Sequence, residues 1–468
     1  MAAQPTTIRS VMPGIVWPAI PTGLDATLLA LQFQLERSQW LSVDELTRLQ
    51  FIQAKELLKH AFATVPYYQQ HLPPGLLADD KDLGWKQWRK IPILERQDIQ
   101  KFSDDLVSKA IPPSHLPIQP GLTSGSTGRP LHSMKTAATG LMWHACALRS
   151  RLWHQHDVSA KLAAIKAVEK NVAEAPDGAR FSSWGADSDM FVPHGQVVLL
   201  NVRSSVDEQL NWLKKEEPEF LVAYPSNLAA LAETCLARKI KLNKLKGISS
   251  LGEKLMPTQR QLCHRAWGVS IQDTYSAEEA GYMAIQCPVG EHYHVQAEHV
   301  LLEVLDEKGQ PCKPGQIGRV VITTLNNFAK PFIRYAIGDY AEVGEPCACG
   351  RGLPVLKEIM GRTRNMFVRP DGQTFWPVMP NPGKEFIAKM PAVRQYQYVQ
   401  KSPEWIEIRI AIENAPYPVD VEAAITKALR KEYGYPFKVT FAYMKEIPTS
   451  GRGKYEEFMS EMTSEAER

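Results

Sequence analysis

The chain has 468 residues, of which 44% are hydrophobic and 22% are charged. This length exceeds that of one typical domain, so we expect two or three domains with well-formed hydrophobic cores. The 54 basic and 51 acidic residues give a formal charge of +3. This balance argues against a nucleic-acid-binding protein, because such a protein concentrates positive charge.

The seven cysteines are odd in number and unevenly spread along the chain. This pattern is not typical of a disulfide framework and favours a reducing cytoplasm. No apolar run approaches the ~20 residues that a membrane-spanning helix needs, so we expect no membrane association. Residues 1–25 lack the charged start and apolar block of a signal peptide, and their prolines predict an extended arm.

The first predicted helix begins at a capping box, formed by Ser42 and Glu45. Apolar residues then recur at roughly helical spacing from Leu46 to Ala61, so one face of this helix is expected to pack inward. Pro66 and the two tyrosines that follow it are expected to close the segment.

A run of small residues, Thr-Ser-Gly-Ser-Thr-Gly, occupies positions 123–128. Its side chains cannot form a core, but its backbone N–H groups can turn inward together, because Gly125 and Gly128 allow positive φ. Such a nest suits the phosphates of a nucleotide. It differs from the common P-loop, since Arg129 and Pro130 follow in place of Lys-Ser/Thr. A flexible Ser/Gly linker is the alternative. The candidate phosphate-binding residues are Thr123, Ser124, Gly125, Ser126, Thr127 and Gly128.

From residue 131 to about 220, helical and strand-like patterns alternate, as in an α/β domain. Residues 221–226 indicate a buried strand that leads into a helix capped by Ser226. Residues 248–254 and 269–275 each look like a strand end that runs into a polar turn. Ligands bind at the carboxyl ends of strands in parallel α/β sheets, so both turns are candidate site positions.

The later part of the chain is richer in strands. Residues 300–305 and 318–323 indicate two strands of a β-rich subdomain. After residue 362 the pattern changes: residues 405–412 alternate strictly, and residues 419–433 form an amphipathic helix pattern that ends at Gly434. This last part predicts a compact α+β unit of about a hundred residues, large enough to be a separate domain.

Four metal-ligating residues form a second candidate site: Cys287, His294, Cys347 and Cys349. The sequence Cys-Ala-Cys-Gly-Arg at 347–351 is typical of the tight turn of a metal knuckle, and three thiolates with one imidazole suit tetrahedral Zn²⁺. His292 competes with His294 as the fourth ligand. Such a closed site would be structural. Free buried thiols are the alternative.

Several of these segments resemble the motifs of one enzyme family. The pattern Thr-Ser-Gly-Ser-Thr-Gly-x-Pro is similar to the phosphate loop of the adenylate-forming superfamily of acyl- and aryl-CoA ligases. The segments at 275–279, 334–339, 361–362 and 448–454 follow in the order of that family's other motifs. The opening helix with Pro-Tyr-Tyr, the segment 90–94 and the Cys-x-Cys-Gly-Arg turn resemble the phenylacetate–CoA ligase branch.

The resemblance covers nearly the whole chain and implies a domain organisation. It implies an α/β protein whose large N-terminal domain, residues 1–362, holds several subdomains: α/β sheets and a β-rich part. A small mobile α+β C-terminal domain, residues 363–468, would carry the catalytic lysine.

The resemblance also implies roles for individual residues. Tyr275 would stack on adenine, and Glu279 would hold Mg²⁺ near the phosphates. Asp339 would accept hydrogen bonds from both ribose hydroxyls, which suits an acceptor-only carboxylate. Arg362 would contact ribose or phosphate. Lys454, in a Pro-x-Thr-x-x-Gly-Lys-like loop, would stabilise the transition state. The further nucleotide-binding residues by this match are Gly252 and Glu253, on the adenine side, and Ser276.

Three positions depart from the family pattern. Ser276 replaces a glycine, and Glu278 replaces the usual hydroxyl residue. A carboxylate at 278 would repel the nucleotide unless it binds metal or turns away; alternatively, Glu278 and Glu279 are solvated acids at a helix start. Arg364 stands where the hinge carboxylate is expected, so domain rotation is expected to be tuned differently or not used.

The implied reaction is the ATP-dependent activation of an aryl or acyl carboxylic acid to an acyl-AMP, followed by transfer to CoA. Two anions must approach each other, which requires cations, inward N–H groups and a metal. The implied cofactors are ATP, Mg²⁺ and CoA, with a structural Zn²⁺. Three alternatives stay open: transfer to a carrier protein or an amine, adenylylation of a coenzyme, and a non-catalytic nucleotide-binding protein. A homodimer also stays open, and the sequence does not name the acid.

Overall fold

The computed structural model describes residues 7–76, 83–122, 131–169, 171–362, 367–375, 377, 393–412, 419–445, 447 and 458–462. The predicted phosphate loop at 123–128, the hinge position Arg364 and the predicted catalytic Lys454 lie outside these described residues.

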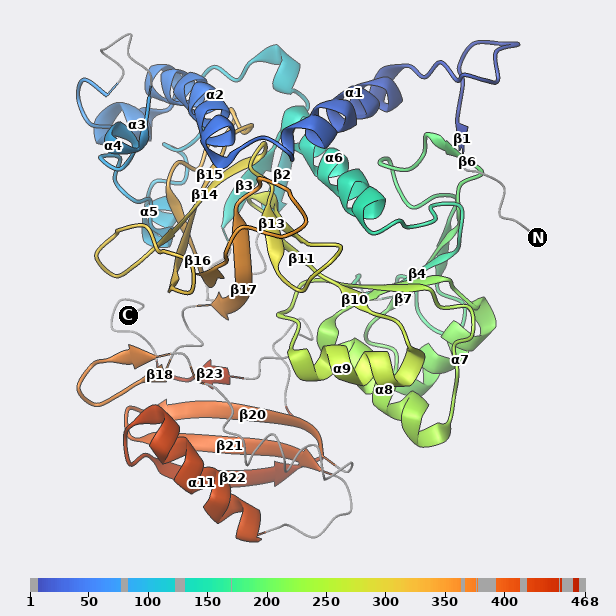
Figure 1. Cartoon of the computed structure of the whole chain (residues 1–468), viewed down its shortest axis with the longest axis vertical. Helices are drawn as coiled ribbons and strands as arrows, with labels where there is room; N and C mark the ends of the chain where they lie inside the picture. The colour runs from blue at the N-terminus through green and yellow to red at the C-terminus, as the bar shows by residue number, and fades with distance from the viewer. Residues whose placement is uncertain are drawn as a thin grey trace.

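The N-terminal segment leads into a layer of helices at one end of the molecule (Figure 1). The predicted capping box is confirmed: Ser42 Oγ accepts from the Glu45 amide at 3.3 Å, and Glu45 Oε2 accepts from the Ser42 amide at 3.1 Å. The elements of this part are β1 (Thr7–Ile8), α1 (Gly23–Ser38), α2 (Val43–Thr64), α3 (Pro66–His71), α4 (Trp85–Trp88), α5 (Arg96–Lys101) and the 3-10 helix η1 (Pro113–His115).

A six-stranded sheet forms the α/β part of the molecule. Its strand order is β10-β9-β8-β4-β7-β5; neighbours from β10 to β7 run parallel, and β5 is an antiparallel edge. The strands are β4 (Leu162–Lys166), β5 (Ala179–Phe181), β7 (Val197–Asn201), β8 (Phe220–Ala223), β9 (Gly247–Ser250) and β10 (Ile271–Gln272). Helices α7 (Val206–Glu216), α8 (Pro225–Arg238) and α9 (Pro257–Trp267) pack with this sheet, whereas α6 (Ala137–Trp153) contacts α1 and β12. Strand β6 (Phe191–Val192) pairs with β1.

The predicted capping role of Ser226 is wrong. Helix α8 begins at Pro225, which suits the first helical position because proline lacks an N–H group. Tyr224 is the N-cap and provides no side-chain hydrogen bond. The Ser226 amide and hydroxyl instead donate to the carboxylate of Glu253, from the turn after β9.

A seven-stranded antiparallel sheet forms the β-rich part. Its order is β11-β12-β13-β17-β16-β15-β14. The strands are β11 (Thr274–Ala277), β12 (Gly281–Gln286), β13 (Tyr293–Val295), β14 (Val300–Leu305), β15 (Ile317–Thr324), β16 (Tyr335–Val343) and β17 (Val355–Arg362). A separate hairpin, β2 (Gln119–Leu122) with β3 (His132–Lys135), flanks the predicted phosphate loop.

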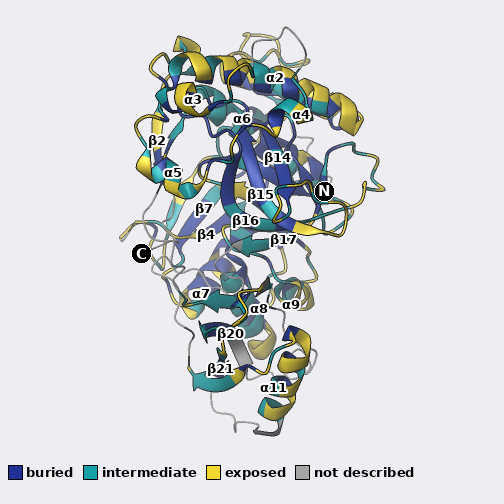
Figure 2. Ribbon diagram, turned by 90° about the vertical axis from the view of Figure 1, so that its left-hand side faces the viewer, coloured by how far each residue is buried: buried dark blue, intermediate teal, exposed yellow. Residues whose placement is uncertain are grey.

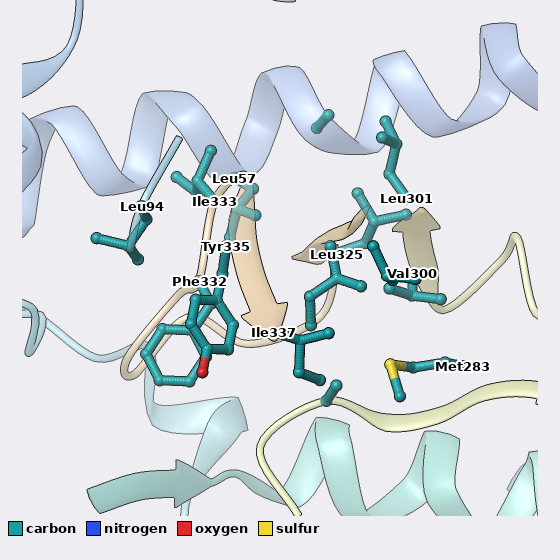
Figure 3. Close-up of a cluster of buried hydrophobic side chains, with 14 of the residues drawn as sticks. Leu57, Leu94, Met283, Val300, Leu301, Leu325, Phe332, Ile333, Tyr335 and Ile337 are labelled. Atoms are coloured by element: carbon teal, nitrogen blue, oxygen red, sulfur yellow. The ribbon is translucent and has the colours of Figure 1, made fainter. Parts of the chain in front are cut away.

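The largest hydrophobic cluster joins this sheet to helix α2. Leu57 of α2 and the residues Phe332, Ile333 and Tyr335 at the start of β16 are fully buried in it. Figure 3 shows these side chains between the helix and the strands. Figure 2 shows that β14 and β15 are buried while one side of α2 is exposed. The inward face predicted from the apolar spacing is confirmed for Leu46, Leu57 and Ala61, but it is wrong for Leu49 and Ile52, which are exposed.

The C-terminal unit has a core of its own. Ile406, Ile408 and Ile410, which alternate along β21, pack with Leu429 of α11. Its sheet has the order β22-β21-β20-β23, and Figure 1 shows the helix α11 along it. The elements are β18 (Phe367–Val368), β19 (Thr374–Phe375), β20 (Val393–Ser402), β21 (Trp405–Ile412), α11 (Val419–Tyr433), β22 (Lys438–Met444) and β23 (Phe458–Ser460). The division of the chain at residue 362 stays a prediction.

The start of β16 is held by a buried ion pair. Arg334 Nε and Nη2 each lie 3.0 Å from the carboxylate of Glu303 on β14, and both side chains are 4% exposed. Arg334 Nη1 donates to the carbonyl of Ile91 at 2.7 Å, and Trp88 Nε1 donates to Glu303 at 3.0 Å. The arginine of the 334–339 motif therefore anchors a strand and does not face a ligand.

Removing Arg334 should destabilise the chain strongly. Arg334→Met leaves the Glu303 carboxylate buried without its cation, which is expected to cost about 3–5 kcal/mol. The measurement is the first transition in guanidinium unfolding followed by tryptophan fluorescence. Arg238→Met is the matched control, since Arg238 and its partner Asp207 are both more than half exposed and such a pair contributes below about 1 kcal/mol. Equal losses in the two variants would contradict the anchoring role.

Candidate active site

Two predicted nucleotide-binding residues meet in the structure. Tyr275 lies on β11, and Asp339 lies on β16 of the same sheet. The Tyr275 hydroxyl donates to Asp339 Oδ2 at 2.7 Å, and both residues are buried. The aromatic ring and the carboxylate thus form one surface from segments that are far apart in the sequence.

The other predicted adenosine-side residues lie around this pair. Asp339 is paired with Arg362 across β16 and β17, although the Arg362 side chain is outside the described part of the chain. Gly252 has φ +73° and is exposed in the turn after β9. Ser276 is exposed at an irregularity in the pairing of β11 with β12.

The turn after β9 is fixed at both ends. The Glu253 carboxylate accepts from the Ser226 amide at 3.0 Å, at the helix end where a negative charge is favoured. Lys254 Nζ lies 2.9 Å from a carboxylate oxygen of Glu358 on β17. The turn is therefore held between α8 and the strand that ends in Arg362.

Asp273, which sequence reasoning missed, holds the backbone just before Tyr275 by hydrogen bonds. Its carboxylate accepts from Ser250 Oγ at 2.6 Å and from the Tyr293 hydroxyl at 2.5 Å, and its amide donates to Gln286 Oε1 at 2.9 Å. Burial raises the pKa of the Asp273 carboxyl. These bonds join the end of β9 to the seven-stranded sheet two residues before Tyr275.

The acidic residues Glu278 and Glu279 lie in the turn between β11 and β12, so their interpretation as acids at a helix start is wrong. Glu279 is buried, whereas the Glu278 side chain is 41% exposed. Lys135 Nζ, at the end of β3, lies 2.7 Å from Glu278 Oε1. The carboxylate that departs from the family pattern is thus paired with a cation.

Both acids line a cavity of about 190 Å³ at the foot of the β2–β3 hairpin. One wall is Trp143 of α6, and Ser133 of β3 is almost fully buried there. The polar residues around the cavity are Gln119, Ser133, Lys135, Thr139, His144, Glu278, Glu279, His299, Thr324, Asn326 and Asn327. Sequence reasoning missed all of these except the two acids, because only the fold brings them together.

His299 holds the backbone next to Glu279. Burial lowers its pKa to about 4, so the ring is neutral at pH 7. Its Nε2 lies 2.8 Å from the carbonyl of Ala280, which fixes the proton there, and its Nδ1 can accept from Asn326 Nδ2 at 3.3 Å. Gly281 follows with φ +76°, and a side chain there would collide with the imidazole.

The four predicted metal ligands lie together. One donor atom from each of Cys287, His294, Cys347 and Cys349 lies within 4.8 Å of the others. Cys287 Sγ and Cys347 Sγ are 3.8 Å apart, and two thiolates bound tetrahedrally at ~2.3 Å from a zinc ion would be separated by about that distance. Cys349 Sγ lies 3.4 Å from His294 Nε2. The donor set therefore fits Zn²⁺.

His292 lies at the edge of this cluster. Its Nε2 is 2.9 Å from Cys347 Sγ, a distance that suits an N–H donor to a thiolate better than two ligands of one metal.

Beyond the cluster, the Arg351 guanidinium lies 4.3 Å from the ring centroid of Trp153 and 5.0 Å from that of Trp40. The knuckle thereby contacts α6 and the corner between α1 and α2.

In the described part of the chain, no helix combines the length and the apolar character that crossing a bilayer requires.

No protein-family model matches the chain. It is similar to the phenylacetate-coenzyme A ligase of Thermus thermophilus, with 29% identity over 169 residues, which are 35% of this chain and 38% of that protein. It is also similar to the phenylacetate-coenzyme A ligases of Escherichia coli, with 23% identity over 72% of this chain and 75% of that protein, and of Pseudomonas putida, with 22% identity over 71% and 74%.

Solved structures share the fold. A 2-hydroxyisobutyryl-CoA ligase in the postadenylation state with 2-HIB-AMP superposes with a TM-score of 0.71, at 17% identity over 91% of this chain and 92% of that one. The same enzyme in the thioesterification state gives a TM-score of 0.58. The named curated relatives and the shared fold agree with the motif order along the chain. The chain is thus similar in sequence to phenylacetate-coenzyme A ligases and shares the fold of a solved CoA ligase.

Proposed function

We propose that this chain activates a small carboxylic acid with ATP and transfers the acyl group to CoA. In the first step a carboxylate oxygen bonds to the α-phosphorus, and the bond to the β-phosphate breaks to release pyrophosphate. In the second step the CoA sulfur bonds to the acyl carbon, AMP leaves, and the thiol proton goes to solvent. The observation that carries the proposal is the buried hydrogen bond between Tyr275 and Asp339.

The adenosine end of ATP would lie on this pair. The ring of Tyr275 would stack on adenine, and its hydroxyl donates to Asp339. A carboxylate only accepts hydrogen bonds and has two oxygens, which suits the two hydroxyls of a ribose diol. Arg362 at the opposing strand position would add a cation for ribose or phosphate. Gly252, in a backbone turn without a side chain, would let adenine approach closely.

The phosphate end would lie toward the cavity. Glu279 is a buried carboxylate at its wall, and oxygen ligands of this kind suit Mg²⁺, which would neutralise charge on the phosphates. The residues 123–128, which lie between β2 and β3 in the sequence, would supply amide donors to phosphate oxygens. Lys454, from the C-terminal unit, would stabilise charge that develops between carboxylate and phosphate.

The relatives give this proposal its substrate class. The curated proteins that the chain is similar to are named phenylacetate-coenzyme A ligase, and the 2-hydroxyisobutyryl-CoA ligase that shares the fold was solved with 2-HIB-AMP and, in the thioesterification state, with 2-HIB-AMP and CoA. Aryl and short acyl acids are therefore the first candidates. The C-terminal unit, with its own core, would act as the mobile domain between the two steps.

The thiol and imidazole cluster is proposed to hold a structural Zn²⁺. Cys287, His294, Cys347 and Cys349 would be the ligands, and a closed set of four leaves no open position for catalysis. His292 would orient Cys347 by a hydrogen bond from outside the ligand set.

Acid-dependent release of pyrophosphate tests the proposed reaction. The chain, MgATP and a panel of aryl and acyl acids should release pyrophosphate with at least one acid, and addition of CoA should yield the thioester by mass spectrometry. Lys454→Ala should lower pyrophosphate exchange by about 100-fold or more, the effect expected for a lost transition-state cation. Full exchange activity in Lys454→Ala, or a CoA-independent product with every active acid, would contradict the proposal.

Metal removal tests the zinc site. A purified chain should contain about one zinc per chain. Chelation should change the tryptophan fluorescence, because Arg351 belongs to the 347–351 knuckle and contacts the rings of Trp40 and Trp153. Cys349→Ser should lose the zinc and lower the thermal unfolding midpoint. Cys312→Ser is the matched control, since Cys312 is a free thiol outside the cluster. A chain that is free of zinc and insensitive to chelator would contradict the site.

A further inference from the structure

The cavity below the hairpin holds an ion pair that the proposed reaction has not used. Lys135 Nζ lies 2.7 Å from Glu278 Oε1 and 5.7 Å from the ring centroid of Trp143. Both partners of the pair are partly exposed, at 37% and 41%, so ligands can reach them. Glu279 is buried in the same turn. A cation and two carboxylates therefore line one small space.

Ser133, on the same strand as Lys135, presents an unsatisfied hydroxyl to this cavity. The residue is 3% exposed, and its Oγ has no hydrogen-bond partner among the described residues. Because an unpaired buried hydroxyl is unfavourable, such a group points to a bound ligand. A small anion with several acceptor oxygens would satisfy it.

Gly121 lies beside the Ser133 hydroxyl. It is the cross-strand partner of Ser133. A side chain at Gly121 would collide with Ser133 Oγ and would come within 3.3 Å of Glu278 Oε1. The serine hydroxyl and the glutamate carboxylate thus reach the same point beside the hairpin.

We propose that Lys135 and Ser133 bind the diphosphate end of ATP, and the pyrophosphate it releases, and that Glu278 is a second carboxylate for the magnesium ion held by Glu279. The inference rests on the proposed function, because it assumes that a nucleotide occupies the neighbouring Tyr275–Asp339 surface. The family pattern has a hydroxyl residue at position 278, where this chain has a glutamate. Ser133 would supply a hydroxyl in its place. Lys135 neutralises Glu278 until the phosphates arrive and then contributes its charge to them.

The arrangement explains how a carboxylate is tolerated at position 278. Alone, it would repel a polyphosphate at short range. Lys135 cancels that charge, and the magnesium that accompanies ATP gives the carboxylate a second partner. Tyr275 and Asp339 do not line the cavity. The adenosine and α-phosphate end of the nucleotide would therefore lie apart from Ser133, Lys135 and Glu278.

Direct binding to the full-length chain tests the proposal, with MgATP, pyrophosphate and AMP as titrants in calorimetry. Lys135→Met should weaken pyrophosphate and MgATP binding by about 10–100-fold, the range for a lost charged hydrogen bond, and should leave AMP binding within about twofold. Ser133→Ala should weaken pyrophosphate binding by about 5–10-fold with the same AMP result. Lys59→Met is the matched control, because Lys59 forms a 2.7 Å ion pair with Glu56 on the exposed side of α2.

Glu278→Gln should change two measurements in opposite directions. Without metal, pyrophosphate should bind several-fold more tightly, because the competing carboxylate is gone and Lys135 is released. The magnesium concentration needed for half-maximal ATP binding should rise several-fold, because a ligand of the ion is lost. A purely structural ion pair would produce neither change.

Three results would overturn the inference. They are unchanged pyrophosphate affinity in Lys135→Met, an unchanged magnesium requirement in Glu278→Gln, or equal losses for AMP and pyrophosphate, which would indicate general disruption. Intact MgATP binding with no acid-dependent pyrophosphate release would contradict the ligase reaction and leave this inference standing. A wild-type chain that binds no MgATP would overturn both.

Discussion

The buried ion pair between Arg334 and Glu303 fixes the strand that carries Asp339 of the proposed nucleotide site. It holds the first residues of β16 against β14 and against the carbonyl of Ile91. Asp339 lies further along the same strand, and β17 runs beside it with Arg362 opposite. Because the strand cannot shift without exposing a charge, Asp339 keeps its place relative to Tyr275. Arg334 thus contributes to the proposed nucleotide site by holding the strand in place.

The proposed phosphate end of the site depends on the balance between carboxylates and cations. Lys135 forms an ion pair with Glu278 beside the hairpin, and Glu279 is buried in the same turn as Glu278. Polyphosphate and carboxylates can share such a space only if cations are present in comparable number. The paired lysine and the expected magnesium meet that need, and the neutral His299 fixes the backbone of the turn without adding charge.

The sequence predicted the parts of this fold that are encoded locally. Helix α2 follows from its capping box and apolar spacing, and β21 follows from strict alternation. The motif resemblance named Tyr275 and Asp339 as nucleotide-binding residues, and in the structure a hydrogen bond joins them. It could not reveal Asp273 or Ser133, because their roles arise from contacts with strands distant in sequence. The capping of α8 was mispredicted for the same reason, since its acceptor, Glu253, comes from another turn.

We propose that Asp339, held by β16 and bonded to Tyr275, recognises the ribose of a nucleotide. The most direct measurement is the ratio of the dissociation constants of 2′,3′-dideoxy-ATP and ATP, in the wild-type chain and in Asp339→Asn. The account predicts that the wild type prefers ATP by about 10–100-fold, as two lost hydrogen bonds to a charged acceptor imply, and that the preference falls to within about threefold in Asp339→Asn. An equal preference for ATP in both proteins would contradict it.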